Sequence, residues 1–337
     1  MRILLDVMGG DLSPRELVRG GIAAGRRQGI DILFSGDPVA IRTTLAEMGE
    51  REGDRFSILP AYQTIGMNEP PVRAVRGKRD SSLVQGLLSL KEHEVDAFVS
   101  PGNTGAVVAG SIFILGRIAG IPRPAIAASI PTVSGREILV LDMGANVDCA
   151  PEHLLYFALM GVTYARAVLG IPHPTVGLLN IGSEKGKGNR LNHLAYELLE
   201  NGPLPFVGNV EGHRLLTERP VDVVVCDGFV GNIFLKTLEG GISTVTNLMK
   251  DLIGKSIRAK LGGLLLRPVF STLREKLSYH HLGGAPLLGV EGSVVIAHGR
   301  SNAEAIASAI TVASRAVESR VNETIEHGIS GWRSNGS

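Results

Sequence analysis

The chain is poor in cysteine, in aromatic residues and in net charge. Its 337 residues include two cysteines, 4% aromatic residues and a formal charge of +1. Two cysteines without C-x-x-C spacing indicate no disulfide framework and fit a reducing, cytoplasmic setting. So few aromatic side chains argue against a stacking platform for single-stranded nucleic acid, and the balanced charge argues against a basic nucleic-acid-binding surface. We expect no nucleic acid among its partners.

Long hydrophobic runs are also missing. No segment approaches the roughly 18 uninterrupted apolar residues that mark a candidate membrane-spanning helix. The first apolar run meets Asp6 too soon to be the core of a signal peptide. Hydrophobic residues nevertheless make up 44% of the chain and 43 residues are glycine. The sequence therefore predicts a globular protein with a substantial core and many tight turns.

Motifs for common cofactors are absent. There is no G-x-G-x-x-G fingerprint, and the nine histidines show neither H-E-x-x-H nor another paired ligand spacing. The loop that begins at Gly182 resembles a P-loop, but it has three residues before the Gly186-Lys187 pair where that motif needs four. We expect no cofactor and no metal. Cys149 is a minor candidate for a nucleophile, and Cys226 is expected to be a core thiol.

Short apolar runs alternate with helical patterns throughout the chain. The predicted strands are residues 2–8, 31–36, 56–60, 95–100, 125–131, 137–144, 175–182, 205–210, 221–228 and 293–299. The predicted helices lie near residues 13–26, 82–93, 104–118, 152–169, 189–200, 230–253 and 302–320. This alternation predicts an α/β fold with a mainly parallel sheet between helices. We expect one domain over residues 1–330 and a flexible tail over 331–337.

Six loops that follow predicted strands share one composition: glycine, Asn or Asp, and a helix that opens directly afterwards. They are residues 6–11, 100–106, 142–148, 180–189, 226–232 and 297–302. Ligands of such folds bind beyond the carboxyl ends of the strands, and helix N-termini attract anions. The loops therefore predict a shared anion-binding cleft, although any one of them alone is more typical of a helix-capping turn. Lys187 is expected to contact the anion, and His298 is an acid/base candidate.

Residues 250–276 are basic and apolar, with seven Lys or Arg against two acids. Leu264, Leu265 and Leu266 lie in the middle of this segment, between a glycine pair and a proline, and Lys260 and Arg267 flank them. The pattern predicts two helices that meet at an apolar tip. A membrane surface, an acidic protein or a second subunit would suit such a tip, and packing on the chain's own body is the alternative.

Many of these segments resemble the bacterial PlsX family of phosphate acyltransferases. The matching segments are "DVMGGD" (6–11), "MNEPPVRAVRGKRDSS" (67–82), "GNTGA" (102–106), "RPAIA" (123–127), "LDMGANVDCAPEHL" (141–154), "GLLNIGSEKGKGN" (177–189), "CDGFVGNIFLKTLEG" (226–240) and "AHGRSN" (297–302). They follow the family order over residues 1–320. The resemblance implies a Rossmann-like three-layer α/β/α sandwich, similar to phosphotransacetylase and to isocitrate and isopropylmalate dehydrogenases, and a homodimer with a membrane-associated hairpin at residues 250–276.

The family reaction converts acyl-[acyl carrier protein] and inorganic phosphate into acyl phosphate. The resemblance implies that a membrane glycerol-3-phosphate acyltransferase of the PlsY type uses the product for phosphatidic acid synthesis. It also implies a cytoplasmic enzyme held peripherally at the inner face of the membrane. The alternatives are a coenzyme A-type phosphotransacylase, a nicotinamide-dependent dehydrogenase of similar fold, and a peripheral membrane scaffold for lipid synthesis.

With this reaction, the candidate residues take specific roles. We expect Lys187, Asn146, Asn232 and His298 to be catalytic, with Lys187 on the phosphate and the asparagines on the phosphate or the oxyanion. Further candidates for binding substrate or phosphate are Gly9, Gly10, Asp11, Asn103, Thr104, Gly144, Gly186, Gly188, Asn189, Asp227 and Gly228. A separate group, Arg73, Arg76, Lys78 and Arg79, either meets the acidic carrier protein or is a solvated charge run.

Overall fold

The computed structural model describes residues 1–335 except 54, 134, 219 and 271–283. Its strands are β1 (Arg2–Asp6), β2 (Asp31–Gly36), β3 (Phe56–Pro60), β4 (Ala97–Ser100), β5 (Ala125–Ile126), β6 (Ala128–Pro131), β7 (Glu137–Leu141), β8 (Val176–Asn180), β9 (Phe206–Glu211), β10 (Val223–Val225), β11 (Ala285–Leu288) and β12 (Ser293–Ile296).

Helices separate most of these strands. They are α1 (Pro14–Gln28), α2 (Pro38–Glu47), α3 (Pro71–Gly77), α4 (Ser82–Lys91), α5 (Thr104–Gly110), the π-helical turn η1 (Ser111–Leu115), α6 (Pro151–Ala167), α7 (Arg190–Glu200), α8 (Gly212–Thr217), α9 (Gly228–Gly254), α10 (Ile257–Leu265), α12 (Ala303–Glu318) and α13 (Val321–Asn335). The predicted alternation of strands and helices is confirmed.

The strands form two sheets. The first has the order β3-β2-β1-β4-β12-β11-β5, and the second has the order β6-β7-β10-β8-β9. Most neighbours are parallel, but β11 is antiparallel to both of its neighbours and β6 is antiparallel to β7. The chain passes from the first sheet to the second at Ala127, between β5 and β6, so one predicted strand (125–131) contributes to both sheets.

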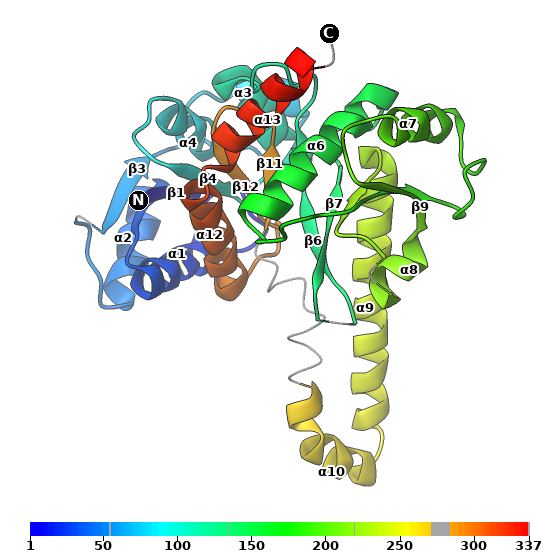
Figure 1. Cartoon of the computed structure of the whole chain (residues 1–337). Coiled ribbons are helices and arrows are strands. Elements are labelled where there is room, and N and C mark those ends of the chain that lie inside the picture. Colours follow the sequence, from blue (N-terminus) through cyan, green and yellow to red (C-terminus); the bar gives the residue numbers. More distant parts are fainter. Residues whose placement is uncertain (54, 134, 219, 271–283, 336–337) are drawn as a thin grey trace.

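The first sheet is covered on both faces, as its apolar strands predict. Ile3 and Leu5 of β1 are buried against α1 and α12, whereas Leu4 between them is buried on the side of α4. Successive side chains of a strand point to opposite faces, so a continuous apolar run fits a strand with helices on both sides. Figure 1 shows α1 and α12 beside this sheet.

The second sheet packs in the same way. Leu139 and Leu141 of β7 are buried in a cluster with residues of α6 and α13, and Val140 is buried on the opposite face. Trp332 of α13 is partly buried and meets Tyr156 edge-on, with ring centroids 5.7 Å apart. The sequence predicted a flexible tail from residue 331, whereas in the structure helix α13 continues to Asn335.

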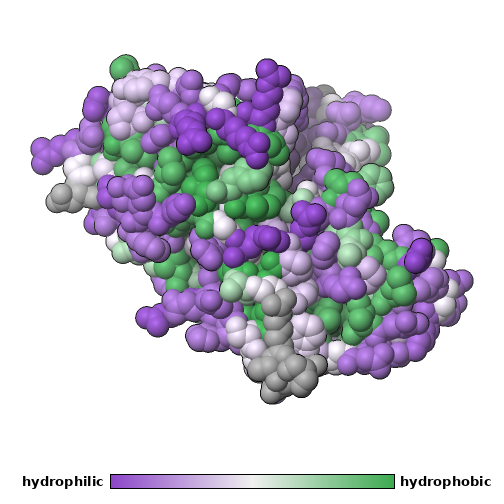
Figure 2. All heavy atoms as spheres, turned by 90° about the horizontal axis from the view of Figure 1, so that it is seen from above, coloured by the Kyte–Doolittle hydropathy of each residue, from purple (hydrophilic) through white to green (hydrophobic). Residues whose placement is uncertain are grey.

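Helix α9 extends far beyond the body, and α10 lies at its outer end (Figure 1). The predicted hairpin at 250–276 thus begins much earlier, since its first helix starts at Gly228. Its last part, residues 271–276, lies outside the described residues. No helix among the residues that the structure describes is long and apolar enough to cross a membrane. Seen from the end opposite this arm, hydrophobic and hydrophilic areas alternate on the surface (Figure 2).

Candidate active site

Three of the six predicted loops meet at one end of the first sheet. They follow β1, β4 and β12, which are neighbours in that sheet. A Cβ placed on Gly9 would lie 2.8 Å from Cα of Gly102, so the first loop touches the second, backbone to backbone. The backbone N–H of Asp11 donates to the carbonyl of Gly299 at 2.7 Å, which joins the first loop to the third. The three loops lie together because parallel neighbouring strands have their carboxyl ends at the same edge of the sheet.

Two more loops meet at the second sheet, after β7 and β10. The N–H of Gly228 donates to the carbonyl of Asn146 at 2.8 Å. Gly144 has φ +125°, which favours glycine, and a Cβ there would lie 3.4 Å from the amide of Asn232. The first turn of α9 is therefore packed directly on the loop that follows β7.

A cavity of about 350 Å³ lies between the two groups of loops. One wall is formed by the first residues of α5 and by residues that follow β12, and the other by the loop after β7 and one face of α9. The polar or close-packed residues that line it are Thr104, Gly105, Gly144, Asn232, Lys236, Glu239, His298 and Ser301. Its apolar wall consists of Ile126, Met143, Leu235, Ala285, Ile296 and Ala297. The volume and the mixed lining suit a small-molecule site.

Two buried carboxylates hold the loops around this cavity. Asp6 accepts hydrogen bonds from the backbone N–H groups of Met8 (3.0 Å) and Gly9 (3.1 Å) and from the hydroxyl of Ser100 (2.8 Å). Asp142 does the same for the second sheet, with four backbone N–H donors at 2.7–3.2 Å. Burial raises the pKa of both carboxyls above the ordinary value, while these hydrogen bonds oppose the rise. Both acids order loops and do not line the cavity.

The predicted asparagines divide into two roles. The amide nitrogen of Asn103 donates to the carbonyls of Gly66, Met67 and Glu69 at 2.9–3.3 Å, and its oxygen caps α5. The amide nitrogen of Asn146 donates to the Pro124 carbonyl at 2.7 Å and to Asp142 at 2.9 Å. The amide N–H groups of both side chains are therefore used in hydrogen bonds within the protein.

Asn232 differs from the other two asparagines, because its amide lines the cavity and no hydrogen bond from it to the rest of the described chain is present. Among the other predicted binding residues, Thr104 and Gly144 also line the cavity. Gly10 lies beside Gly299 at the edge of the first group of loops. Asp227 caps α9 through the N–H of Val230 at 2.8 Å, so it positions the helix that holds Asn232.

His298 lies at the cavity with a defined ring orientation. Its Nδ1 accepts a hydrogen bond from the backbone N–H of Arg300 at 3.1 Å. An accepting Nδ1 places the proton of the neutral ring on Nε2, and Nε2 is then the donor available to a ligand. This geometry suits a hydrogen-bond donor at the carbonyl oxygen or at the leaving group.

Lys236 is a cavity residue that the sequence analysis missed. It follows Asn232 by one helical turn on α9 and lines the same cavity. Within the described part of the chain, no carboxylate lies within 4.0 Å of its ammonium group. The i, i+4 spacing of Asn232 and Lys236 in the predicted helix 230–253 was the signal that would have found it.

Lys187 lies elsewhere, in the loop between β8 and α7. Its side chain is 48% exposed and its ammonium group is 3.9 Å from Glu184. Gly186 faces open space, Gly188 has φ +98°, and Asn189 caps α7 through the N–H of Asn192 at 3.0 Å. The loop is a well-formed helix-capping turn, and none of its residues is among those that line the cavity.

Comparison with known proteins places the chain in a family. The profile of the family described as "Fatty acid synthesis protein" matches residues 1–324. The chain belongs to this family. A phosphate acyltransferase from Desulforudis audaxviator is 47% identical over 340 residues, which cover 100% of this chain and 98% of that protein.

Solved structures agree with the predicted fold of this family member. A phosphotransacetylase from Streptococcus pyogenes superposes with a TM-score of 0.61 at 18% identity and covers 94% of each chain. A 4-hydroxythreonine-4-phosphate dehydrogenase from Klebsiella pneumoniae gives 0.54 at 12% identity, covering 94% of this chain and 98% of that one. At such low identity the likeness concerns the fold alone. The α/β fold with mainly parallel strands and helices on both sides is confirmed.

The two cysteines of this family member are poorly suited to be nucleophiles. Burial, with a further contribution from the Asp142 carboxylate, raises the pKa of Cys149 to about 12. Burial raises the pKa of Cys226 well above its ordinary value, as expected for a core thiol. Since the thiolate is the attacking species, the raised pKa values disfavour a nucleophilic role for either residue at neutral pH. Among the described residues, no three His, Cys, Asp or Glu side chains gather into a group that would hold a metal ion.

Proposed function

We propose that the chain is a phosphate acyltransferase that transfers the acyl group of acyl-[acyl carrier protein] to inorganic phosphate, and that its product, acyl phosphate, enters phospholipid synthesis. The family and its relatives named phosphate acyltransferase support the acyl transfer to phosphate. The acidic carrier protein as donor rests on the sequence motifs, and coenzyme A thioesters are the alternative donors.

One observation supports this function most strongly: the cavity combines an anion site with an apolar wall. Lys236 and the N-terminal ends of α5 and α12 attract negative charge. Asn232 and His298 supply N–H donors beside them. Leu235, with the other apolar lining residues, suits the first carbons of an acyl chain. Phosphate and a thioester carbonyl thus find complementary groups within one small space.

The reaction then needs no nucleophile from the protein. An oxygen of hydrogen phosphate attacks the thioester carbonyl carbon, the tetrahedral intermediate collapses, and the carbon–sulfur bond breaks. The sulfur leaves as a thiolate and takes up the proton that the phosphate loses, which gives the free carrier thiol. We assign Lys236 to the phosphate, and the amide of Asn232 and Nε2–H of His298 to the oxyanion and the departing sulfur. Positioning the two reactants and donating to the oxyanion are the main contributions, and one such donor contributes about 2.7–4 kcal/mol in other enzymes.

Lys187 stays a second candidate for phosphate contact. Its side chain is half-exposed and its ion pair with Glu184 is long, at 3.9 Å, so the ammonium group can bind an anion. Because Lys236 lines the cavity and Lys187 does not, Lys236 is the preferred candidate for phosphate contact.

Release of free carrier thiol tests the proposed function. The substrate is purified long-chain acyl-[acyl carrier protein], with and without inorganic phosphate, and with hydroxylamine as the trap for acyl phosphate. Phosphate-dependent release with one hydroxamate per thiol supports the proposal. Absence of release at saturating phosphate contradicts it and leaves the scaffold as the alternative, whereas activity with acyl-coenzyme A alone favours the coenzyme A-type phosphotransacylase.

We also propose that the outer end of the arm binds the inner face of the membrane. Leu264, Leu265 and Leu266 are 64%, 82% and 49% exposed there, and Lys260 and Arg267 flank them. Apolar side chains ringed by cations suit an anionic lipid surface. The product would then form close to the membrane glycerol-3-phosphate acyltransferase (PlsY type) that uses it, from a cytoplasmic enzyme attached peripherally.

Vesicle flotation tests the membrane proposal. Leu264→Glu/Leu265→Glu should abolish flotation with phosphatidylglycerol vesicles and leave turnover of dissolved substrate unchanged. Leu194→Glu, on the exposed surface of α7, is the control and should float like the wild type. Unchanged flotation of the double variant would refute the membrane role of this tip.

The homodimer is proposed from exposed apolar residues along α9. Val245, Leu248 and Leu252 are 52–58% exposed and follow heptad-like spacing, which is typical of a helix that packs on another helix. Val245→Glu/Leu248→Glu should convert a dimer into a monomer in light scattering. A wild-type protein that is itself monomeric would contradict the proposal.

A further inference from the structure

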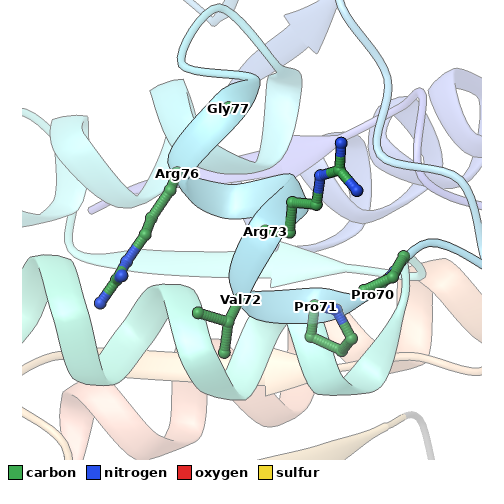
Figure 3. A pocket seen from close by; sticks show the side chains of 6 residues that line it. All are labelled: Pro70, Pro71, Val72, Arg73, Arg76 and Gly77. Atoms are coloured by element: carbon green, nitrogen blue, oxygen red, sulfur yellow. The ribbon is translucent and has the colours of Figure 1, made fainter.

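A second hollow lies on the surface of α3 (Figure 3). It is open and has a volume of about 700 Å³, and six residues of one short segment line it: Pro70, Pro71, Val72, Arg73, Arg76 and Gly77. Val72 is 45% exposed, and Phe113 of η1 nearby is 49% exposed. We call the surface formed by Val72, Arg73, Arg76 and Phe113 the α3 face.

The α3 face is positively charged. The guanidinium of Arg76 lies 5.1 Å from the centre of the Phe113 ring, so a cation covers an exposed aromatic side chain. Within the described ranges, no carboxylate lies within 4.0 Å of the guanidinium of Arg73 or Arg76. The nearby Lys78, by contrast, is neutralised by Glu69 at 2.6 Å. Exposed apolar groups with unpaired arginines are typical of a surface that binds an acidic protein.

This face is coupled rigidly to the cavity. A Cβ on Gly105 would lie 2.6 Å from Pro71, so the start of α3 packs directly on the start of α5. The three hydrogen bonds of Asn103 hold the loop before α3 to the same helix end. Gly105 itself lines the cavity. A partner seated on α3 is therefore held at a fixed position relative to the reacting groups.

We propose that the α3 face is the docking surface for the acidic carrier protein, which presents its acyl thioester to the neighbouring cavity. This inference rests on the proposed function and adds the place where the donor binds. The unpaired arginines match the acidic surface of such a carrier, and the shared α3–α5 contact puts that surface next to the site of acyl transfer.

Other occupants fit the α3 face less well. In a twofold contact between two copies, the same patch meets itself, which would set these arginines against each other. We have proposed that the tip of the arm binds the membrane, and this tip lies at the end of the molecule away from α3 (Figure 1).

Charge reversal tests the docking surface. In Arg73→Glu/Arg76→Glu, the KM for acyl-[acyl carrier protein] should rise about tenfold or more and lose its salt dependence. Turnover at saturating donor and the KM for phosphate should stay within about twofold of the wild type, since neither arginine lines the cavity. Arg27→Glu/Arg51→Glu is the matched control: both arginines are exposed, near the amino-terminal edge of the first sheet, and the charge change is the same.

The outcomes separate the two proposals. If the wild type releases thiol with phosphate and the α3 variant has an unchanged donor KM, the docking surface is wrong and the function stands. A change in oligomeric state of the variant would identify the face as an interface between copies and also overturn docking.

A photo-crosslinking residue gives a second test that is independent of arginine variants, of their folding and of turnover. Placed at Val72, it should capture the carrier protein, whereas at Val39, which is 71% exposed on α2, it should not. Capture at Val39 and none at Val72 refutes the proposal.

Discussion

Gly231 lies where the first turn of α9 touches the loop after β7, and its replacement by alanine should damage both stability and activity. A Cβ at this position would lie 2.0 Å from the carbonyl oxygen of Asp142 and 3.1 Å from the sulfur of Cys226. Carbon–oxygen contacts below about 3 Å are strongly repulsive, so the helix must move by about 1 Å or more. Overpacking of this kind costs about 3 kcal/mol.

The shift also reaches the cavity, because Asn232 is the next residue and Lys236 follows one turn later. A misplacement of about 1 Å at a reacting site reduces turnover by about a hundredfold. We therefore expect a lower free energy of unfolding in urea, and a large loss of phosphate-dependent thiol release even under conditions in which the variant is folded.

Gly240→Ala is the matched control on the same helix. No atom lies within 4 Å of a Cβ at that position, and alanine favours the helix over glycine by about 1 kcal/mol. Gly240→Ala should thus be as stable as the wild type or more stable, with unchanged turnover. Equal unfolding midpoints for Gly231→Ala and the wild type would refute the close packing of α9 on this loop.

Two further results are expected. Lys236→Ala should raise the KM for phosphate and lower kcat/KM about ten- to a hundredfold, as expected for the loss of a charge-assisted hydrogen bond of about 1.5–3 kcal/mol. Lys187→Ala should have a smaller effect in the same assay. The reverse order of effects would place the phosphate site at the loop of Lys187. Because the pKa of Cys149 is raised from 9.0 to about 12, its thiolate fraction at pH 8 is about a thousandfold lower than that of an ordinary cysteine. Iodoacetamide should therefore alkylate Cys149 slowly at pH 8, and faster as the pH rises towards 12. Rapid alkylation at pH 8 with loss of turnover would contradict this prediction.

Most strands and long helices could be predicted from the sequence, because their apolar runs are buried on one or both faces. The helices α2, α3, α8 and α13 and the strand β11 were missed. The start of α2 had a signal, an Asp37 cap followed by proline. Strand β11 is four residues long, and one of its two partners, β5, lies far away in the sequence. Strand pairing depends on contacts far apart in the sequence, so the two sheets and their antiparallel strands could not be predicted from local patterns.

The candidate site was predicted in its location more than in its residues. Four of the six glycine-containing loops line the cavity and a fifth, residues 6–11, contacts two of them, because the parallel strands of each sheet end at a common edge. Composition could not distinguish Asn103 and Asn146, whose amides bind backbone carbonyls, from Asn232, whose amide lines the cavity. Lys236 was not predicted because it lies within a helix, and its spacing from Asn232 becomes informative only once Asn232 is known to line the cavity.

Transfer of labelled phosphate tests the central claim most directly. The wild-type protein is incubated with long-chain acyl-[acyl carrier protein] and phosphate labelled with ¹⁸O at every oxygen, and the acyl product is identified by mass spectrometry. Direct attack by phosphate predicts acyl phosphate that retains all the label, formed in equal amount with free carrier thiol. Unlabelled fatty acid as the main acyl product, or thiol release at the same rate without phosphate, would contradict it.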